Sequence, residues 1–69
     1  MLPNHFSVED ALKLGNTVAA DWGKITLSEF HLGLNMELEQ ADESDTEELL
    51  AGRVLHNILD FPNYYSDSL

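Results

Sequence analysis

Cysteine is absent from this sequence of 69 residues, and lysine and arginine together number only three. Without cysteine there is no disulfide framework and no thiolate metal site, as is usual in a reducing compartment, so we expect a cytoplasmic protein. Three cations cannot form the basic patch that grips nucleic acid phosphates, so we expect no direct contact with nucleic acid.

Long apolar runs are also missing. No segment approaches the roughly 18 apolar residues of a membrane span, and the first residues lack the basic and then apolar pattern of a secretory signal. We therefore expect no association with membranes.

Negative charge is what the chain has in excess. Thirteen Asp and Glu residues stand against three Lys and Arg residues, which gives a net charge of -10 and a pI near 4.2. Such an imbalance bears on partners and solubility rather than on the fold. Hydrophobic residues make up 43% of the chain, an ordinary globular proportion, so the sequence predicts one small folded domain that spans residues 1–69.

Two helices are predicted from capping boxes that precede amphipathic segments. Ser7 begins the first helix, at about residues 8–20, and Ser44 with Glu47 begins another at about 45–60. Pro62 ends this later helix, because proline disfavours the helical conformation of the residue before it. A short C-terminal turn follows, and we expect the last four residues to fray.

The segment between these helices carries an apolar side chain at every second position from residue 30 to residue 38, which is typical of a half-buried strand. Thr26 and Glu29, however, form a capping box just ahead of it, and Leu, Met and Glu favour a helix. We therefore predict a helix over about 27–40.

On that helix the apolar residues fall on two faces, so the helix is either central in the bundle or offers its second stripe, Leu32 and Met36, to a partner. The predicted fold is thus all-α, a small bundle of three main helices. Three glycines, Gly15, Gly33 and Gly52, lie inside the predicted helices and indicate close helix approach. Because so short a chain has a thin core, a homodimer would add stability.

Seven carboxylates within twelve residues, with no basic residue among them, are the candidate partner-binding residues. Some of these acids lie near the start of the third predicted helix, where they stabilise the positive end of the helix dipole and keep the loop solvated. The others are left for a basic partner or for solubility alone. The candidate residues are Glu37, Glu39, Asp42, Glu43, Asp45, Glu47 and Glu48.

Metal, cofactor and catalytic motifs are not found. A calcium loop that starts at Asp42 would place Glu47 where glycine is needed and Arg53 where glutamate is needed. The three histidines are isolated and do not have the spacing of metal ligands, and there is no glycine-rich phosphate loop. We therefore predict no enzyme activity, no cofactor and no specific metal site.

A family resemblance covers about residues 6–65. Residues 27–39 read LSEFHLGLNMELE and residues 61–65 read FPNYY. This pattern resembles a group of short acidic bacterial and phage proteins with the motifs L-x-E-F-x-x-G-[LM]-x-x-E-L-E-H and E-F-P-x-Y-Y, although Gln40 replaces the His and Asp60 replaces the Glu. The size, acidity and pattern are also similar to small anti-CRISPR proteins directed against type I-C systems.

This resemblance implies an inhibitor from a phage or mobile element. It would act in the cytoplasm of a bacterial host, bind a subunit of the type I-C crRNA-guided surveillance complex and keep target DNA away. A folded acidic surface would suit that role as a mimic of DNA charge. The alternatives are a helical interaction or dimerisation module that uses Leu32 and Met36, and an acidic protein with no basic partner.

Overall fold

The computed structural model describes residues 2–69 and shows three helices and one short turn. Met1 belongs to the predicted domain but lies outside the described residues. The elements are α1 (Val8–Thr17), α2 (Leu27–Glu39), α3 (Glu47–Asp60) and the 3-10 turn η1 (Ser66–Ser68). Residues 2–69 contain no strand. The prediction of a small all-α bundle of three helices is therefore confirmed, and α2 is the helix instead of the strand that its alternation suggested.

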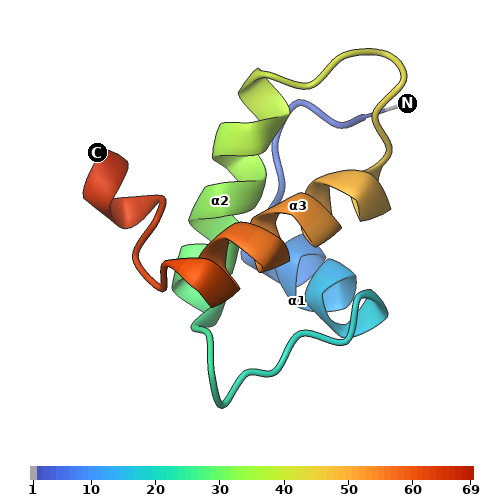
Figure 1. The fold of residues 1–69 in the computed structure, drawn as a ribbon. Coiled ribbons are helices and arrows are strands. Elements are labelled where there is room, and N and C mark those ends of the chain that lie inside the picture. Colours follow the sequence, from blue (N-terminus) through green and yellow to red (C-terminus); the bar gives the residue numbers. More distant parts are fainter. Residues whose placement is uncertain (1) are drawn as a thin grey trace.

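Helix α2 is the centre of the arrangement. It packs against both α1 and α3, and α3 crosses it while α1 lies behind α3 (Figure 1). The N-terminal segment passes along one side of α2, and the C-terminal segment lies on the other side (Figure 1). The bundle measures 30 × 25 × 18 Å.

Helix α1 begins at the predicted capping box, in which Asp10 N–H donates to the Ser7 hydroxyl and Ser7 N–H donates to the Asp10 carboxylate. These hydrogen bonds lower the pKa of Asp10. The helix ends at Thr17, earlier than the predicted residue 20, because Ala19 adopts the left-handed conformation with φ 59°. Ala20 N–H then donates to the Gly15 carbonyl, which completes a Schellman ending with alanine where glycine is usual.

Helix α3 begins two residues later than predicted. Thr46 is its N-cap and accepts from Leu49 N–H at 3.2 Å. Ser44, the expected cap, is instead held by Asp42, whose Oδ1 accepts from the Ser44 N–H at 2.8 Å and from its hydroxyl at 2.6 Å. Because the Ser44 hydroxyl is bonded to Asp42 in this local turn, it does not cap the helix.

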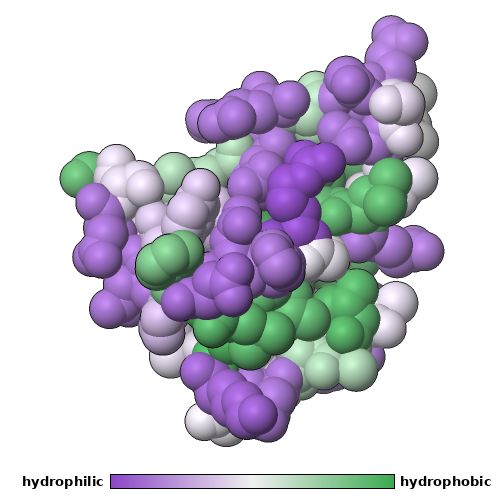
Figure 2. Space-filling model, viewed as in Figure 1, coloured by the Kyte–Doolittle hydropathy of each residue, from purple (hydrophilic) through white to green (hydrophobic). Residues whose placement is uncertain are grey.

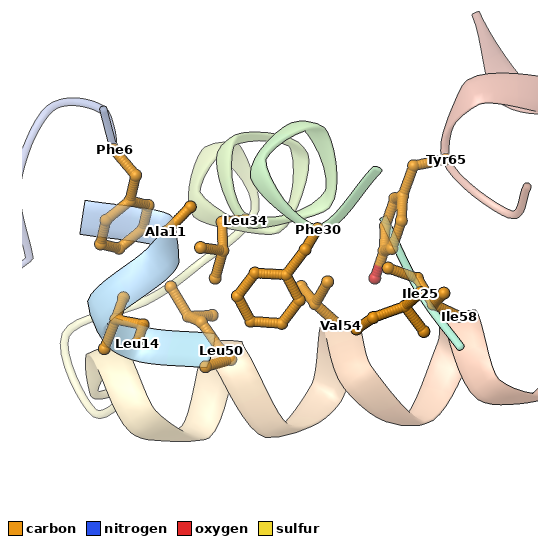
Figure 3. Packing of buried hydrophobic residues seen from close by; sticks show 11 residues of the cluster. Phe6, Ala11, Leu14, Ile25, Phe30, Leu34, Leu50, Val54, Ile58 and Tyr65 are labelled. Carbon is orange, nitrogen blue, oxygen red and sulfur yellow. The ribbon is translucent and has the colours of Figure 1, made fainter. Parts of the chain in front are cut away.

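Buried side chains from all three helices and from both terminal segments form one hydrophobic core. Phe6 lies at one end of the core and Tyr65 at the other, with Phe30 and Leu34 of α2 between them (Figure 3). Phe6, Phe30 and Leu34 have no exposed surface, and Tyr65 is 2% exposed. Most core residues come from the three helices, and each terminal segment adds one buried aromatic ring to them.

Leu32 and Met36 are half-buried and pack against this core. Of the two alternatives for the second apolar stripe of α2, the structure therefore supports the central helix. Both residues keep part of their surface exposed, so their use as a seam for a partner stays a prediction.

The three helix glycines differ in what surrounds them. A Cβ at Gly33 would lie 2.6 Å from the Tyr65 ring and 2.7 Å from Val54, and one at Gly15 would clash with the Trp22 ring. A Cβ at Gly52 would meet nothing within 4 Å. Close approach of another helix is thus confirmed at Gly33, which faces Val54 of α3. At Gly15 the close neighbour is the Trp22 ring from the connection between α1 and α2, and at Gly52 the expectation is wrong.

The N-terminal segment is fastened to α2 at one residue. Phe6 N–H donates to Asn35 Oδ1 at 2.7 Å, and Asn35 Nδ2 donates back to the Phe6 carbonyl at 3.0 Å. His31 Nε2 lies 2.7 Å from the same carbonyl oxygen, which can only accept, so this nitrogen carries the proton. The side chains of His31 and Asn35, one helical turn apart, thus satisfy both backbone hydrogen-bonding groups of Phe6.

The C-terminal segment, residues 61–69, is fastened to the other side of α2. Glu29, only 7% exposed, accepts from Tyr65 N–H at 2.8 Å and from Ser66 N–H at 3.1 Å. The Tyr65 hydroxyl donates to Glu37 Oε2 at 2.9 Å and accepts from Asn57 Nδ2 at 2.9 Å. The expectation of a frayed end is wrong, because these bonds lead into η1.

Helix α2 begins at the predicted residue, but only one half of its predicted capping box forms. Thr26 does cap the helix and accepts from Glu29 N–H at 3.2 Å. In a complete capping box the Glu29 carboxylate would accept from the Thr26 N–H. Here this carboxylate accepts from the N–H groups of Tyr65 and Ser66 instead. Burial raises the pKa of the Tyr65 phenol, so at neutral pH the phenol is protonated and donates its hydrogen bond to Glu37.

Candidate functional site

The candidate residues gather where α2 ends, along the loop of residues 40–46 and at the start of α3. Figure 2 shows hydrophilic residues along this upper edge of the molecule and a hydrophobic area below α3. The loop has its own hydrogen bonds: Asp42 N–H donates to the Asp45 carboxylate at 3.1 Å, and Asp45 N–H donates to the Asp42 carbonyl at 3.1 Å. The acids are therefore presented by a loop of defined shape.

Two of the seven candidate acids are used inside the molecule. Glu37 is half-buried, accepts from Tyr65 and lies 3.5 Å from Arg53 Nη1. Asp45 is also half-buried and lies 3.3 Å from Arg53 Nη2. Arg53 thus joins the last turns of α2 to the loop, and it compensates charge that the sequence suggested was available to a partner.

The other five acids are exposed, and we call them the acidic surface: Glu39, Asp42, Glu43, Glu47 and Glu48. Hydrogen bonds from the Ser44 hydroxyl and backbone lower the pKa of Asp42, so this carboxylate stays ionised well below neutral pH. Among the lysines and arginine of the described residues, Arg53 alone lies within ion-pair distance of a carboxylate, and its partners are Glu37 and Asp45. The acidic surface therefore keeps its negative charge unpaired.

Two adjacent hollows organise the acidic surface. The larger, about 720 Å³, is edged by Glu39, Asp42 and Glu43, and the smaller, about 270 Å³, is lined by Glu47 and Glu48 among others. Both hollows share Leu2 in their walls, so the N-terminal segment lies between them. The acids of the two hollows thus lie on either side of the N-terminal segment at Leu2.

The larger hollow is lined in part by apolar side chains, and we call it the apolar groove. Leu2 and Pro3 come from the N-terminal segment, Leu38 from the last turn of α2, and Ala41 from the loop. Leu2, Leu38 and Ala41 pack against the core from outside and remain partly exposed. The sequence pattern does not predict this groove, because nothing local indicates that residues 2–4 return to the end of α2; only the burial of Phe6 brings them there.

Neither a cluster of metal ligands nor a membrane-spanning helix is present in the described residues. Within residues 2–69, no three His, Asp or Glu side chains are placed to hold a metal ion together. In the same part of the chain, no helix has the length and apolar character needed to cross a bilayer. The chemistry that the site offers is therefore that of clustered carboxylates beside an apolar groove.

Fold and site together define a small acidic helical protein with an unpaired carboxylate surface. Comparison with models of protein families, with curated proteins and with solved structures gave no match to this chain.

Proposed function

We propose that this protein is a non-enzymatic anti-CRISPR inhibitor that binds a cationic DNA-binding surface of the type I-C crRNA-guided surveillance complex and excludes target DNA. The specific target follows from the family resemblance of residues 27–39 and 61–65. The observation that carries the mechanism is the position of five exposed acids around one loop, with the nearest cation, Arg53, already paired with Glu37 and Asp45.

The physical basis of the proposal is competition between two polyanions. A surveillance complex binds duplex and displaced DNA through Lys and Arg on a cationic path. An acidic protein with a net charge of -10 is steered to the same path, and it needs no bases to compete there. Because the acidic loop is fixed by hydrogen bonds between Asp42 and Asp45, little ordering entropy is lost on binding.

The test compares two triple reversals with equal effects on net charge. In the first, Glu39→Lys, Glu43→Lys and Glu48→Lys alter the acidic surface. In the matched control, Asp60→Lys, Asp67→Lys and Glu9→Lys alter a last helical turn, a terminal segment and a first helical turn elsewhere. Circular dichroism checks that both variants keep their helices.

The readout is the concentration of inhibitor that prevents a purified type I-C complex from shifting its target DNA. We expect the first variant to lose at least tenfold in potency, about 1.4 kcal/mol or more, while the control stays within about threefold of the unmodified protein. Equal losses would mean that net charge alone acts. Full potency in the first variant would refute the acidic surface as the binding site.

An interaction or dimerisation module is the second candidate, and a different surface favours it. Leu59, Phe61 and Tyr64 are 55%, 64% and 43% exposed at the end of α3 and beyond, and the Phe61 and Tyr64 rings lie 6.4 Å apart. Exposed aromatic and aliphatic groups of this kind are common interface anchors. Sedimentation at high salt tests it: self-association that persists there and is lost in Phe61→Ser would support this candidate.

A further inference from the structure

The apolar groove has a shape and chemistry that the charge competition alone does not require. Its volume of about 720 Å³ lies within the usual range of ligand pockets, and Leu2, Pro3, Leu38 and Ala41 supply its apolar lining. A surface that acted only by attracting cations would not need apolar side chains in this place. An aliphatic group that entered the groove would remove apolar area from water on both sides.

Three acids also line the groove, and we call them its rim. Glu39, Asp42 and Glu43 are exposed carboxylates, and the lowered pKa of Asp42 keeps this rim negative. A nucleic acid, an anionic lipid surface or a second copy of this chain would bring further negative charge to this rim and be repelled. A cationic protein segment is attracted, and arginine in particular forms paired hydrogen bonds with carboxylates.

We infer that the apolar groove binds an aliphatic side chain of the partner protein that is flanked in its sequence by arginine or lysine. This inference rests on the proposed function for the identity of the partner and adds the chemistry by which it is recognised. The apolar contact supplies affinity that salt does not screen, and the flanking cations supply steering and register. The partner segment is therefore distinguished from other cationic surfaces that attract the protein by charge alone.

Two synthetic peptides of equal charge serve as probes. The first is acetyl-Arg-Arg-Leu-Leu-Arg-Arg-amide, and the second has glycine in place of both leucines. Each is titrated into the full ¹⁵N-labelled chain at about 0.15 M and about 0.5 M salt, and amide shifts report the site and the Kd. The surveillance complex is not used, so the result does not depend on whether the protein inhibits it.

With the leucine peptide, we expect shifts centred on Leu2, Asn4, Ala41 and Asp42 and a Kd at least tenfold lower than with the glycine peptide, as burial of one leucine requires. The preference for leucine is expected to persist at the higher salt. Equal affinity for the two peptides, or shifts spread over all acids of the chain, would overturn the inference and leave charge competition intact.

Substitutions in the groove provide the second measurement. Ala41→Gln places a polar side chain in the apolar lining of the groove, and Leu2→Ser removes an apolar side chain from that lining. Neither substitution changes a carboxylate. Leu12→Ser, at a residue 42% exposed on α1, is the matched control. We expect either groove variant to abolish the preference for the leucine peptide, and the control to retain it. A preference that survives both groove variants would place the apolar contact elsewhere and refute the inference.

The inhibition assay separates this inference from the proposed function. If the unmodified protein binds the leucine peptide in the groove but does not keep target DNA from the type I-C complex, then the proposed target is refuted and the inferred groove specificity is supported. If it inhibits without any preference for leucine, then the groove specificity is refuted and charge competition is supported.

Discussion

Carboxylates on the Tyr65 side of α2 and carboxylates of the acidic surface differ in what they bind. Glu29 and Glu37 accept hydrogen bonds from Tyr65 and are largely covered, whereas Glu39, two residues further along the same helix, is exposed. The first pair stabilises the fold by satisfying buried donors. The charge of Glu39 has no such internal use. An acidic sequence therefore contains two populations, and only one of them is available to a partner.

Loss of the Tyr65 ring is the most damaging change that this comparison predicts. Tyr65→Ala leaves a cavity between α2 and α3 and should lower the free energy of unfolding by about 3–5 kcal/mol, enough to unfold much of so small a protein. Tyr65→Phe keeps the ring and should cost about 1 kcal/mol. Urea denaturation followed by circular dichroism measures both; a loss below 1 kcal/mol in the alanine variant would show that Tyr65 does not close the core.

Removal of one carboxylate from each population gives the direct contrast. Glu29→Ala deprives two backbone N–H groups of their acceptor and should lower the free energy of unfolding by about 2–3 kcal/mol. Glu43→Ala, in the acidic surface, should stay within about 0.5 kcal/mol of the unmodified protein. Urea midpoints of the two variants decide the matter, and equal shifts would contradict the division into two populations.

Within the acidic surface, smaller effects of opposite sign are expected from the helix dipoles. Glu39 lies in the last turn of α2, where its charge is unfavourable, and Glu48 lies in the first turn of α3, where it is favourable. Glu39→Lys should therefore raise the free energy of unfolding by about 0.3–1 kcal/mol, and Glu48→Lys should lower it by a similar amount.

Salt provides the control for these two substitutions. Thermal unfolding at low ionic strength should show both shifts, and high salt should diminish them. Shifts that are independent of salt would mean that the lysine side chains act through packing instead of charge. A gain in stability from Glu39→Lys, together with a loss of inhibition, would indicate that this acid is kept for binding.

The helices and their order follow from local sequence patterns, which is why they could be predicted. Thr26 caps α2 as its motif indicates, because the cap depends on residues within one turn. Ser44 failed as a cap because Asp42 binds it first, and Ala19 ended α1 through a conformation that alanine seldom adopts. Competing short-range hydrogen bonds and backbone strain of this kind are not visible in hydrophobic periodicity.

The division of the acids could not be predicted, because it depends on residues far apart in the chain. Glu29 resembles the second half of a capping box, yet it bonds to Tyr65 and Ser66 more than thirty positions away. The apolar groove was missed for the same reason, since Leu2 reaches the end of α2 only when Phe6 is buried. Composition gives the number of carboxylates, and tertiary contacts decide which of them remain exposed.

The attachment of both terminal segments to α2 has a consequence for the rate of folding. Phe6 and Asn35 are 29 positions apart, and Glu29 and Tyr65 are 36 positions apart. Helices of this length form within microseconds, but two such distant pairings require the closure of long stretches of backbone before they yield any stabilising contact. We therefore expect this helical protein to fold more slowly than bundles whose contacts are local, with α2 forming early and gaining its final neighbours last.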